Sequence, residues 1–206
     1  MTVNEMLNIF ETEKIILHFY NDEIFKEQHD NGESYYMIKL DKGSWKFLLY
    51  KRGVEEVKLI FDTKEQAIRY FCIFQIRCKF NREYINLALR NNAILYSDDL
   101  EIENLVELFK KISISSKYYT LNNTLQAESI CLRKMNHDEY VVEVINKKMA
   151  CIYKTLVLDK QSALFVCFMW TYLYYLLLTH VSELQKQGLF LEQLHDDEIK
   201  LVLSSI

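Results

Sequence analysis

The chain has 206 residues, of which half are hydrophobic, 14% are aromatic and 26% are charged, and its formal net charge is −4. This composition can bury a core and excludes an intrinsically disordered chain, and the acidic balance gives no overall attraction to nucleic acid or to anionic membranes. The sequence has no proline and only four glycines. It therefore lacks a linker of the usual flexible composition, and we expect residues 1–206 to form a single compact unit.

The first 100 residues predict a helix, a strand meander and a second helix. Thr2 can cap a short helix, and Thr63 stands at the N-cap of the helix AIRYFCIFQIRCKF, with Gln66 three residues later. Between the two helices, alternating and β-branched runs separated by glycine-containing turns predict an antiparallel meander. The predicted strands are residues 14–20, 34–40, 44–51 and 57–61.

The second half repeats this order of elements. An amphipathic helix is predicted over residues 101–112, followed by strand-like runs at residues 128–134, 140–145 and 150–158. Asp159 is placed to cap the next helix, and a last helix is predicted over residues 190–204.

The next helix contains an uncharged stretch at residues 161–182, which is long enough to span a membrane. Several polar side chains would lie at mid-span, including Tyr172, Tyr174 and His180, and no cluster of lysine or arginine flanks the stretch. The central helix of a soluble domain, covered on most faces, fits the same residues. We expect the buried helix, and a membrane-tethered regulator is the alternative.

Similar residues recur at a nearly constant separation of 95 to 99 positions. This periodicity predicts an internal duplication with halves at residues 1–90 and 100–186. The expected fold class is therefore α+β, with two tandem helix–antiparallel meander–helix halves packed around the central apolar helix. The matched pairs are Phe10 with Phe109, Trp45 with Tyr140, and Ala67 with Ala163.

The motifs of metal, nucleotide and nucleophile chemistry are missing from the sequence. The five cysteines include no C-x-x-C pair and the five histidines no H-x-x-x-H pair. Four scattered glycines cannot form a phosphate loop or a G-x-S-x-G nucleophile turn. We expect no metal, no cofactor and no enzymatic activity. The opening residues MTVNEMLNIFETEK lack the segments of a secretory signal, so a cytoplasmic protein with reduced cysteines is expected.

The first meander resembles a known family. The letters WKFLLYKRG at residues 45–53, followed by FDTKEQA and Tyr70-Phe71, are similar to small bacterial immunity proteins that neutralise polymorphic toxins. Those proteins share a W-x-V-x-Y-x-E-R-G strand and turn and an F-x-[ST]-x-E-x-A-C-x-Y-F helix start. The resemblance covers about 30 residues and departs at Lys51, where an acidic residue is usual, and at Ile68, where cysteine is common. It implies a protein that binds one cognate toxin, blocks its active site or substrate channel, and performs no catalysis.

A toxin that acts on nucleic acid or anionic nucleotides presents a basic working surface, so the complementary surface here should be acidic. The predicted contact residues are Asp98, Asp99 and Glu101, which join the two halves, with Tyr50 and Arg52 at the meander turn as the second choice. The expected partner is a protein toxin with a basic surface, and neither nucleic acid nor a membrane is expected as a partner.

A small cytosolic enzyme or ligand-binding domain remains the alternative function. Its pocket would be lined by the tyrosines of the uncharged stretch, Tyr172, Tyr174 and Tyr175. Gene context distinguishes the two hypotheses, because an adjacent toxin-like reading frame supports the immunity protein and an operon of metabolic genes supports the enzyme.

Overall fold

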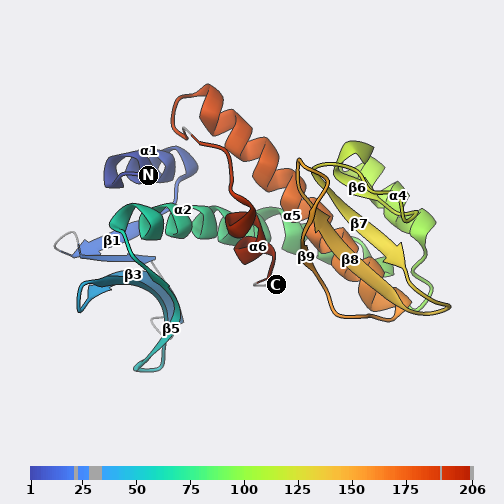
Figure 1. Ribbon diagram of the computed structural model, residues 1–206, viewed down its shortest axis with the longest axis horizontal. Helices are drawn as coiled ribbons and strands as arrows, with labels where there is room; N and C mark the ends of the chain where they lie inside the picture. The colour runs from blue at the N-terminus through green and yellow to red at the C-terminus, as the bar shows by residue number, and fades with distance from the viewer. Residues whose placement is uncertain (21–22, 28–33, 191, 205–206) are drawn as a thin grey trace. The chain divides into compact units, whose positions relative to one another are not determined.

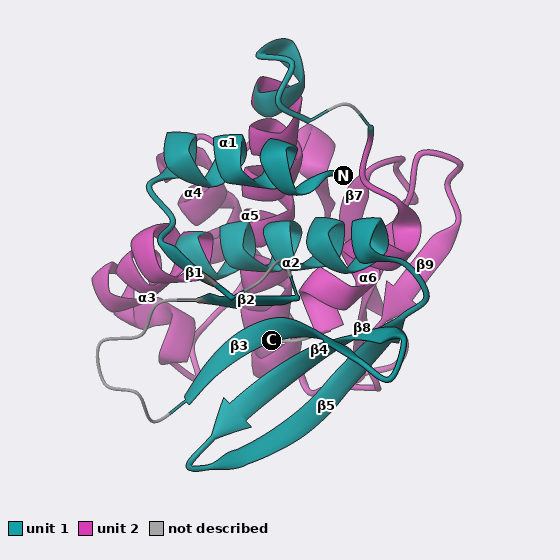
Figure 2. Ribbon diagram, turned by 90° about the vertical axis from the view of Figure 1, so that its left-hand side faces the viewer, with its two compact units in different colours: residues 1–79, 184–192 teal, residues 80–183, 193–206 magenta. Residues whose placement is uncertain are grey.

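The computed structural model describes residues 1–20, 23–27, 34–190 and 192–204 of an α+β protein with two β-sheets. The chain divides into two compact units, which Figure 2 shows in different colours. The first contains residues 1–79 and 184–192, and the second contains residues 80–183 and 193–206. The single compact unit and the repeat boundaries expected from the sequence stay predictions.

The first unit is built on a five-stranded antiparallel sheet with the strand order β1-β2-β3-β4-β5. Two tight turns join β3 to β4 and β4 to β5. Lys42 and Gly43 in the first turn, and Arg52 and Gly53 in the second, have φ angles between 50° and 85°, which glycine adopts without steric cost. The elements, drawn in Figure 1, are α1 (Val3–Glu13), β1 (Leu17–Tyr20), β2 (Ile24–Glu27), β3 (Ser34–Asp41), β4 (Ser44–Lys51), β5 (Val54–Phe61) and nearly all of α2 (Lys64–Phe80).

Aromatic packing holds the first unit together. The ring of Phe47 on β4 lies 5.0 Å from that of Tyr70 and 4.9 Å from that of Phe74, both on α2. The ring of Phe10 on α1 lies 6.5 Å from that of Phe71 on α2. Helix α2 therefore covers one face of the sheet, and α1 packs against α2.

The second unit has a four-stranded sheet with the order β6-β7-β8-β9. Its strands β7, β8 and β9 are antiparallel, as expected, but β6, for which no strand was predicted, pairs with β7 in parallel. The elements are a π-helical turn (Asn81–Ile85), α3 (Asn86–Asn91), a 3₁₀ turn (Ala93–Tyr96), α4 (Ile102–Lys111), a 3₁₀ turn (Ser116–Tyr118), β6 (Tyr119–Thr120), β7 (Ser129–Lys134), β8 (Tyr140–Ile145), β9 (Cys151–Lys154), nearly all of α5 (Lys160–Lys186) and α6 (Asp196–Ser204).

Helix α5 contains the uncharged stretch and carries much of the core of the second unit. The ring of Phe168 stacks on that of Phe109 from α4 at 5.9 Å, and the ring of Trp170 stacks on that of Tyr153 from β9 at 5.2 Å. Within the part of the chain that the structure describes, α5 is the one helix long and apolar enough to cross a bilayer, and 61% of its apolar window is buried. That degree of burial is typical of the core helix of a soluble protein.

Several elements differ from the prediction, and β5 begins at Val54 rather than at residue 57. The first strand begins at Leu17 rather than at residue 14, because Lys14 ends α1 in a left-handed conformation with its N–H on the carbonyls of that helix. Strand β2 lies between the first two predicted strands, where no strand was predicted. The last helix begins at Asp196 rather than at residue 190, because Gly188 (φ 72°) ends the preceding helical turn and the backbone N–H of His195 donates to the Glu198 carboxylate at the new helix start.

The predicted cap of α5 is confirmed. The backbone N–H of Ser162 donates to Asp159 Oδ1 at 2.8 Å, and the Ser162 hydroxyl donates to Oδ2 at 2.7 Å. Replacing Asp159 with alanine should lower the free energy of unfolding by about 1 kcal/mol at pH 7, because the helix loses this cap. The Ser162 backbone N–H also lowers the pKa of the Asp159 carboxyl below its ordinary value of 3.8.

The sign of the pH dependence follows from that lowered pKa. The Asp159 cap stabilises the folded state fully above the unfolded-state pKa, and its contribution is lost as the pH falls through the lower folded-state pKa. Denaturant unfolding of the wild type and of Asp159→Ala should therefore differ more at pH 7 than at pH 2.5. Asp159→Asn, which keeps a capping oxygen, is the control and should lose less stability. An equal difference at both pH values would contradict the assignment.

Candidate functional site: the acidic turn surface

The predicted acidic contact residues lie on a tight turn of the second unit. Within the turn, the backbone N–H of Leu100 donates to the carbonyl of Ser97 at 3.1 Å, and that of Asp99 donates to the Ser97 hydroxyl at 3.1 Å. Leu95 and Leu100, on either side of the turn, are buried. These anchors hold the turn in place and leave Asp98 and Asp99 exposed at its tip.

Side chains in the first turns of α5 contact this turn and hold it in place. The Gln161 amide donates to the carbonyl of Asp98 at 2.6 Å. The ring of Tyr96, just before the turn, lies 5.7 Å from the ring of Phe165, one helical turn further along α5. The position of the turn is thus fixed by contacts within the second unit.

Glu101 differs from its two acidic neighbours. It is the N-cap residue of α4, and its backbone N–H donates a hydrogen bond to the Asn104 side chain at 2.8 Å. Its carboxylate forms an ion pair with Lys160, and this hydrogen bond raises the pKa of the Lys160 ammonium. Among the described residues, no hydrogen bond or ion pair engages the carboxylates of Asp98 and Asp99. Asp98 and Asp99 therefore carry charge available to a partner, whereas Glu101 already serves its own helix.

Three apolar side chains that precede either this turn or α5 in the sequence are exposed. Tyr96 is 66% exposed, Leu156 is 86% exposed and Val157 is 56% exposed. Leu156 is four residues from Lys160, so its Cα lies within about 14 Å of that of Lys160. We define the acidic turn surface as Asp98, Asp99, Tyr96, Leu156 and Val157.

The sequence did not predict that Leu156 and Val157 would be exposed, since residues 150–158 read as one strand. Strand β9 ends at Lys154. The Val142 N–H donates to the Thr155 hydroxyl at 3.1 Å, and Tyr140 and Leu158 exchange two backbone hydrogen bonds of 2.9 Å. Between these two contacts β8 has one residue, Val141, whereas the segment after β9 has two, residues 156 and 157. The segment therefore contains one extra residue and bulges out of the ladder. No signal in the sequence marks this displacement.

Helix α4 borders a depression of about 430 Å³ next to Glu101. Ile102 and Val106 form its helical wall, and the segment around β6 forms the opposite wall. Such a depression can receive an apolar side chain of a partner. It also lies within the second unit.

The second-choice residues are in the first unit. Tyr50 lies on β4, with its ring stacked on that of Tyr35 from β3 at 4.7 Å. Arg52 is exposed in the turn between β4 and β5. The five predicted contact residues therefore form two groups, one in each unit.

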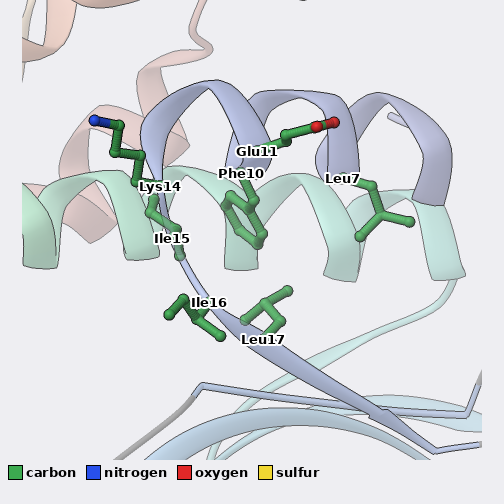
Figure 3. A pocket seen from close by; sticks show the side chains of 7 residues that line it. All are labelled: Leu7, Phe10, Glu11, Lys14, Ile15, Ile16 and Leu17. Atoms are coloured by element: carbon green, nitrogen blue, oxygen red, sulfur yellow. The ribbon is translucent and has the colours of Figure 1, made fainter.

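A second depression, of about 450 Å³, lies between α1 and β1 in the first unit. Figure 3 shows that Leu7 and Phe10 point from α1 toward it, whereas the charged ends of Glu11 and Lys14 point away. It is lined by apolar side chains without a convergent polar group, so it offers no chemistry for a specific ligand.

The tyrosines of the alternative hypothesis lie in the packing of α5. Tyr174 is fully buried, and burial raises its pKa well above the ordinary value for tyrosine. Tyr172 is also buried, and the ring of Tyr175 meets that of Tyr118 edge to face at 5.2 Å. These rings serve as core side chains.

The five cysteines are all free thiols. Burial raises the pKa of Cys167 to about 12, which keeps this thiol protonated and unreactive. Cys151, on β9, is exposed. Among the described residues, no group of three histidine, cysteine, aspartate or glutamate side chains is arranged to hold a metal ion.

The acidic turn surface combines two unpaired carboxylates on a turn held by α5 with an exposed tyrosine just before the turn and exposed aliphatic side chains just before α5. Such a surface can recognise another macromolecule. No protein-family model, curated protein or solved structure matches this chain. A proposal for its function therefore rests on the chemistry of its own surfaces.

Proposed function

We propose that the protein is a cytoplasmic bacterial immunity protein that binds a cognate polymorphic toxin through the acidic turn surface. The observation that carries this proposal is the pair of unpaired, exposed carboxylates, Asp98 and Asp99, on a turn that directly follows the exposed Tyr96. Interfaces gain most of their affinity from a few aromatic and apolar anchors, while surrounding charges guide association and select the partner. The resemblance of residues 45–71 to immunity proteins points in the same direction.

In this proposal the surface neutralises the toxin by filling its active site. The two carboxylates take the place of the anionic groups of the substrate at a basic active site, and Tyr96, Leu156 and Val157 exclude water from the contact. The turn is held by Leu95, Leu100 and Gln161, so little conformational entropy is lost on binding. No step of catalysis is required of this chain, and neither nucleic acid nor a membrane is a partner.

We also propose that the two halves, residues 1–90 and 100–186, arose by duplication and form tandem helix–meander–helix arrangements. Equivalent positions make equivalent local bonds. At the end of α1 the Ile15 N–H donates to the carbonyl of Phe10 at 2.8 Å, and at the end of α4 the Ile114 N–H donates to the carbonyl of Phe109 at 2.8 Å. The residues before them, Lys14 and Ser113, both have positive φ.

The starts of α2 and α5 correspond in the same way. The side chain of Thr63 accepts from the Gln66 N–H at 3.3 Å, and that of Asp159 accepts from the Ser162 N–H at 2.8 Å. Ala67 and Ala163, four residues after each cap, are both fully buried. These matches support the duplication, although the parallel β6 in the second unit has no counterpart in the first sheet.

The test of the proposed function is the double variant Asp98→Lys, Asp99→Lys, which leaves the Glu101 cap intact. Co-expressed with the toxin encoded by the neighbouring reading frame, the variant should protect cells poorly. Its association rate with the purified toxin should fall by about tenfold at low salt, and less at high salt. Its thermal midpoint should stay within a few degrees of the wild-type value.

The matched control is Glu107→Lys, Glu183→Lys. These two exposed carboxylates lie elsewhere on the second unit, and the substitution changes the net charge by the same amount. The control should protect as the wild type does. Full protection by the Asp98→Lys, Asp99→Lys variant at wild-type expression would remove the acidic turn surface from the proposal.

A further inference from the structure

The face of the first sheet that is turned away from α2 carries a distinct set of side chains. Side chains alternate along a strand, and Phe47 on β4 points toward α2. Leu48 and Tyr50 therefore point to the opposite face, together with their partners Met37 and Tyr35 on β3. On β5, Val57 and Ile60 pair with Leu48 and Lys46 and share this face. We define the tyrosine face as Tyr35, Tyr50, Met37, Leu48, Val57 and Ile60.

The tyrosine face is apolar, ordered and in part accessible. Val57 is 48% exposed and Ile60 is 62% exposed, whereas Met37 and Leu48 are buried between them and the tyrosines. The Tyr35 and Tyr50 rings stack at an interplanar angle of 18°. The ammonium of Lys26 lies 3.7 Å from the centroid of the Tyr35 ring. Exposed β-branched and aromatic side chains in a fixed arrangement are typical of a protein-docking surface.

Charges in the middle of this face neutralise one another. Lys39 on β3 and Glu55 on β5 form an ion pair of 3.0 Å that passes over the strand between them, β4. Lys46 pairs with Asp41 at 2.6 Å, and this hydrogen bond lowers the pKa of the Asp41 carboxyl. The centre of the tyrosine face therefore offers little net charge to a partner.

The cations without partners lie at the two ends of β4. Lys42 stands in the turn before β4, and Lys51 and Arg52 stand at the turn after it, and all three are exposed. None of them has an ion pair or side-chain hydrogen bond within the described part of the chain. An eight-residue strand separates the turns by about 26 Å. Residues 34–61 contain six lysine or arginine and three acidic residues, in a chain whose net charge is −4.

From this distribution we infer that the tyrosine face is a docking surface for an acidic protein partner, one whose contact segment has an apolar centre and carboxylates at both ends. The apolar centre would cover Val57, Ile60 and the tyrosine pair, and the two acidic ends would meet Lys42 at one turn and Arg52 at the other, with Lys51 adding positive charge at the end of β4. This surface belongs to the first unit, whereas the acidic turn surface belongs to the second, and the two are opposite in charge. The inference does not rest on the proposed function.

Single-stranded nucleic acid is the other anionic macromolecule that binds aromatic sheet faces beside lysines. A phosphate backbone that crosses the face would meet Glu55 and Asp41, which already hold the central lysines, and would have to separate those ion pairs. A segment with an apolar centre leaves the ion pairs intact. The observed charges therefore favour the protein partner.

The probe for the test is a fluorescein-labelled nine-residue peptide with two aspartates at each end and Leu-Thr-Tyr-Thr-Leu between them. It should bind the full chain with a Kd below about 100 μM at low salt, and about tenfold more weakly at 0.5 M salt. The variant Lys51→Glu, Arg52→Asn should weaken binding by about tenfold. Asparagine is chosen at position 52 because it tolerates the positive φ of that residue. Ile60→Thr, which keeps a β-branched side chain, should weaken binding by about fivefold.

The matched control is Lys148→Glu, Lys200→Gln, two exposed lysines of the second unit with the same change of charge. It should bind the probe within about twofold of the wild type, and the thermal midpoints of all variants should stay close to the wild-type value. Equal binding of a peptide with lysines in place of the aspartates, or absence of probe binding, would overturn the inference. A ten-nucleotide oligothymidine that binds more tightly than the probe, and loses that affinity in Lys51→Glu, Arg52→Asn, would reassign the face to nucleic acid.

Discussion

Replacing Trp170 with alanine should lower the free energy of unfolding by about 3 to 5 kcal/mol, the range for removal of a large buried aromatic side chain. Trp170 lies near the middle of α5, is 5% exposed and stacks on Tyr153 from β9. The truncation leaves a cavity between helix and sheet that the neighbouring side chains can fill only in part. Chemical denaturation followed by circular dichroism measures the change.

Leu156→Ala is the control for this prediction. The side chain is almost fully exposed, in the same unit, and its truncation should change the unfolding free energy by less than about 0.5 kcal/mol. A denaturation midpoint of Trp170→Ala that scarcely moves would show that this face of α5 is accessible. The membrane-tethered alternative would then return.

Replacing Phe47 with alanine should have an effect of similar size, about 3 to 5 kcal/mol, in the first unit. Its buried ring is within 6.4 Å of the rings of Tyr36, Tyr70, Phe71 and Phe74. Aromatic pairs add stabilisation beyond the area that they bury, so the loss should lie toward the upper end of the range. The exposed Ile16 provides the matched control, Ile16→Ala, which should be nearly neutral.

The two tryptophans of the chain show which unit loses stability, because Trp45 lies in the first unit and Trp170 in the second. In Trp170→Ala, fluorescence reports the first unit alone while circular dichroism reports both. Coincident transitions would mean that the two units unfold together, and separate transitions would mean that they unfold independently. A wild-type stability for Phe47→Ala by both probes would contradict the packing described for β4 and α2.

The parts of the fold that the sequence predicted correctly depend on local signals. The caps at Thr63 and Asp159 are set by residues three positions apart, and the turns at Gly43 and Gly53 by neighbouring residues. Strands β2 and β6 depend instead on pairing with other strands, because β2 has only four residues and is held by β1 and β3, and β6 is held by β7. Strand β6 is only two residues long and exists because it pairs with β7, so no periodicity within it could have revealed it.

The candidate site shows the same division. The exposure of Asp98 and Asp99 was predictable, since a short polar run between two helical patterns forms a surface turn. The role of Glu101 was not, because Lys160 is 59 residues away along the chain. The apolar members of the surface, Leu156 and Val157, read as strand residues, and only the pairing of β8 with Thr155 and Leu158 places them outside the sheet.

The turns of this protein rarely use glycine. Among the described residues, seven that are not glycine have a positive φ, and they include Lys14 and Ser113 at helix ends and Met149 before β9. A side chain in this conformation costs about 1 to 2 kcal/mol relative to the right-handed one, a penalty that glycine largely avoids. Substituting glycine at such positions could therefore increase the stability of the folded protein. Positions of this kind are expected because selection maintains stability only above the level that function requires. The margin for engineering a more stable form of this protein lies in its backbone turns rather than in its already dense core.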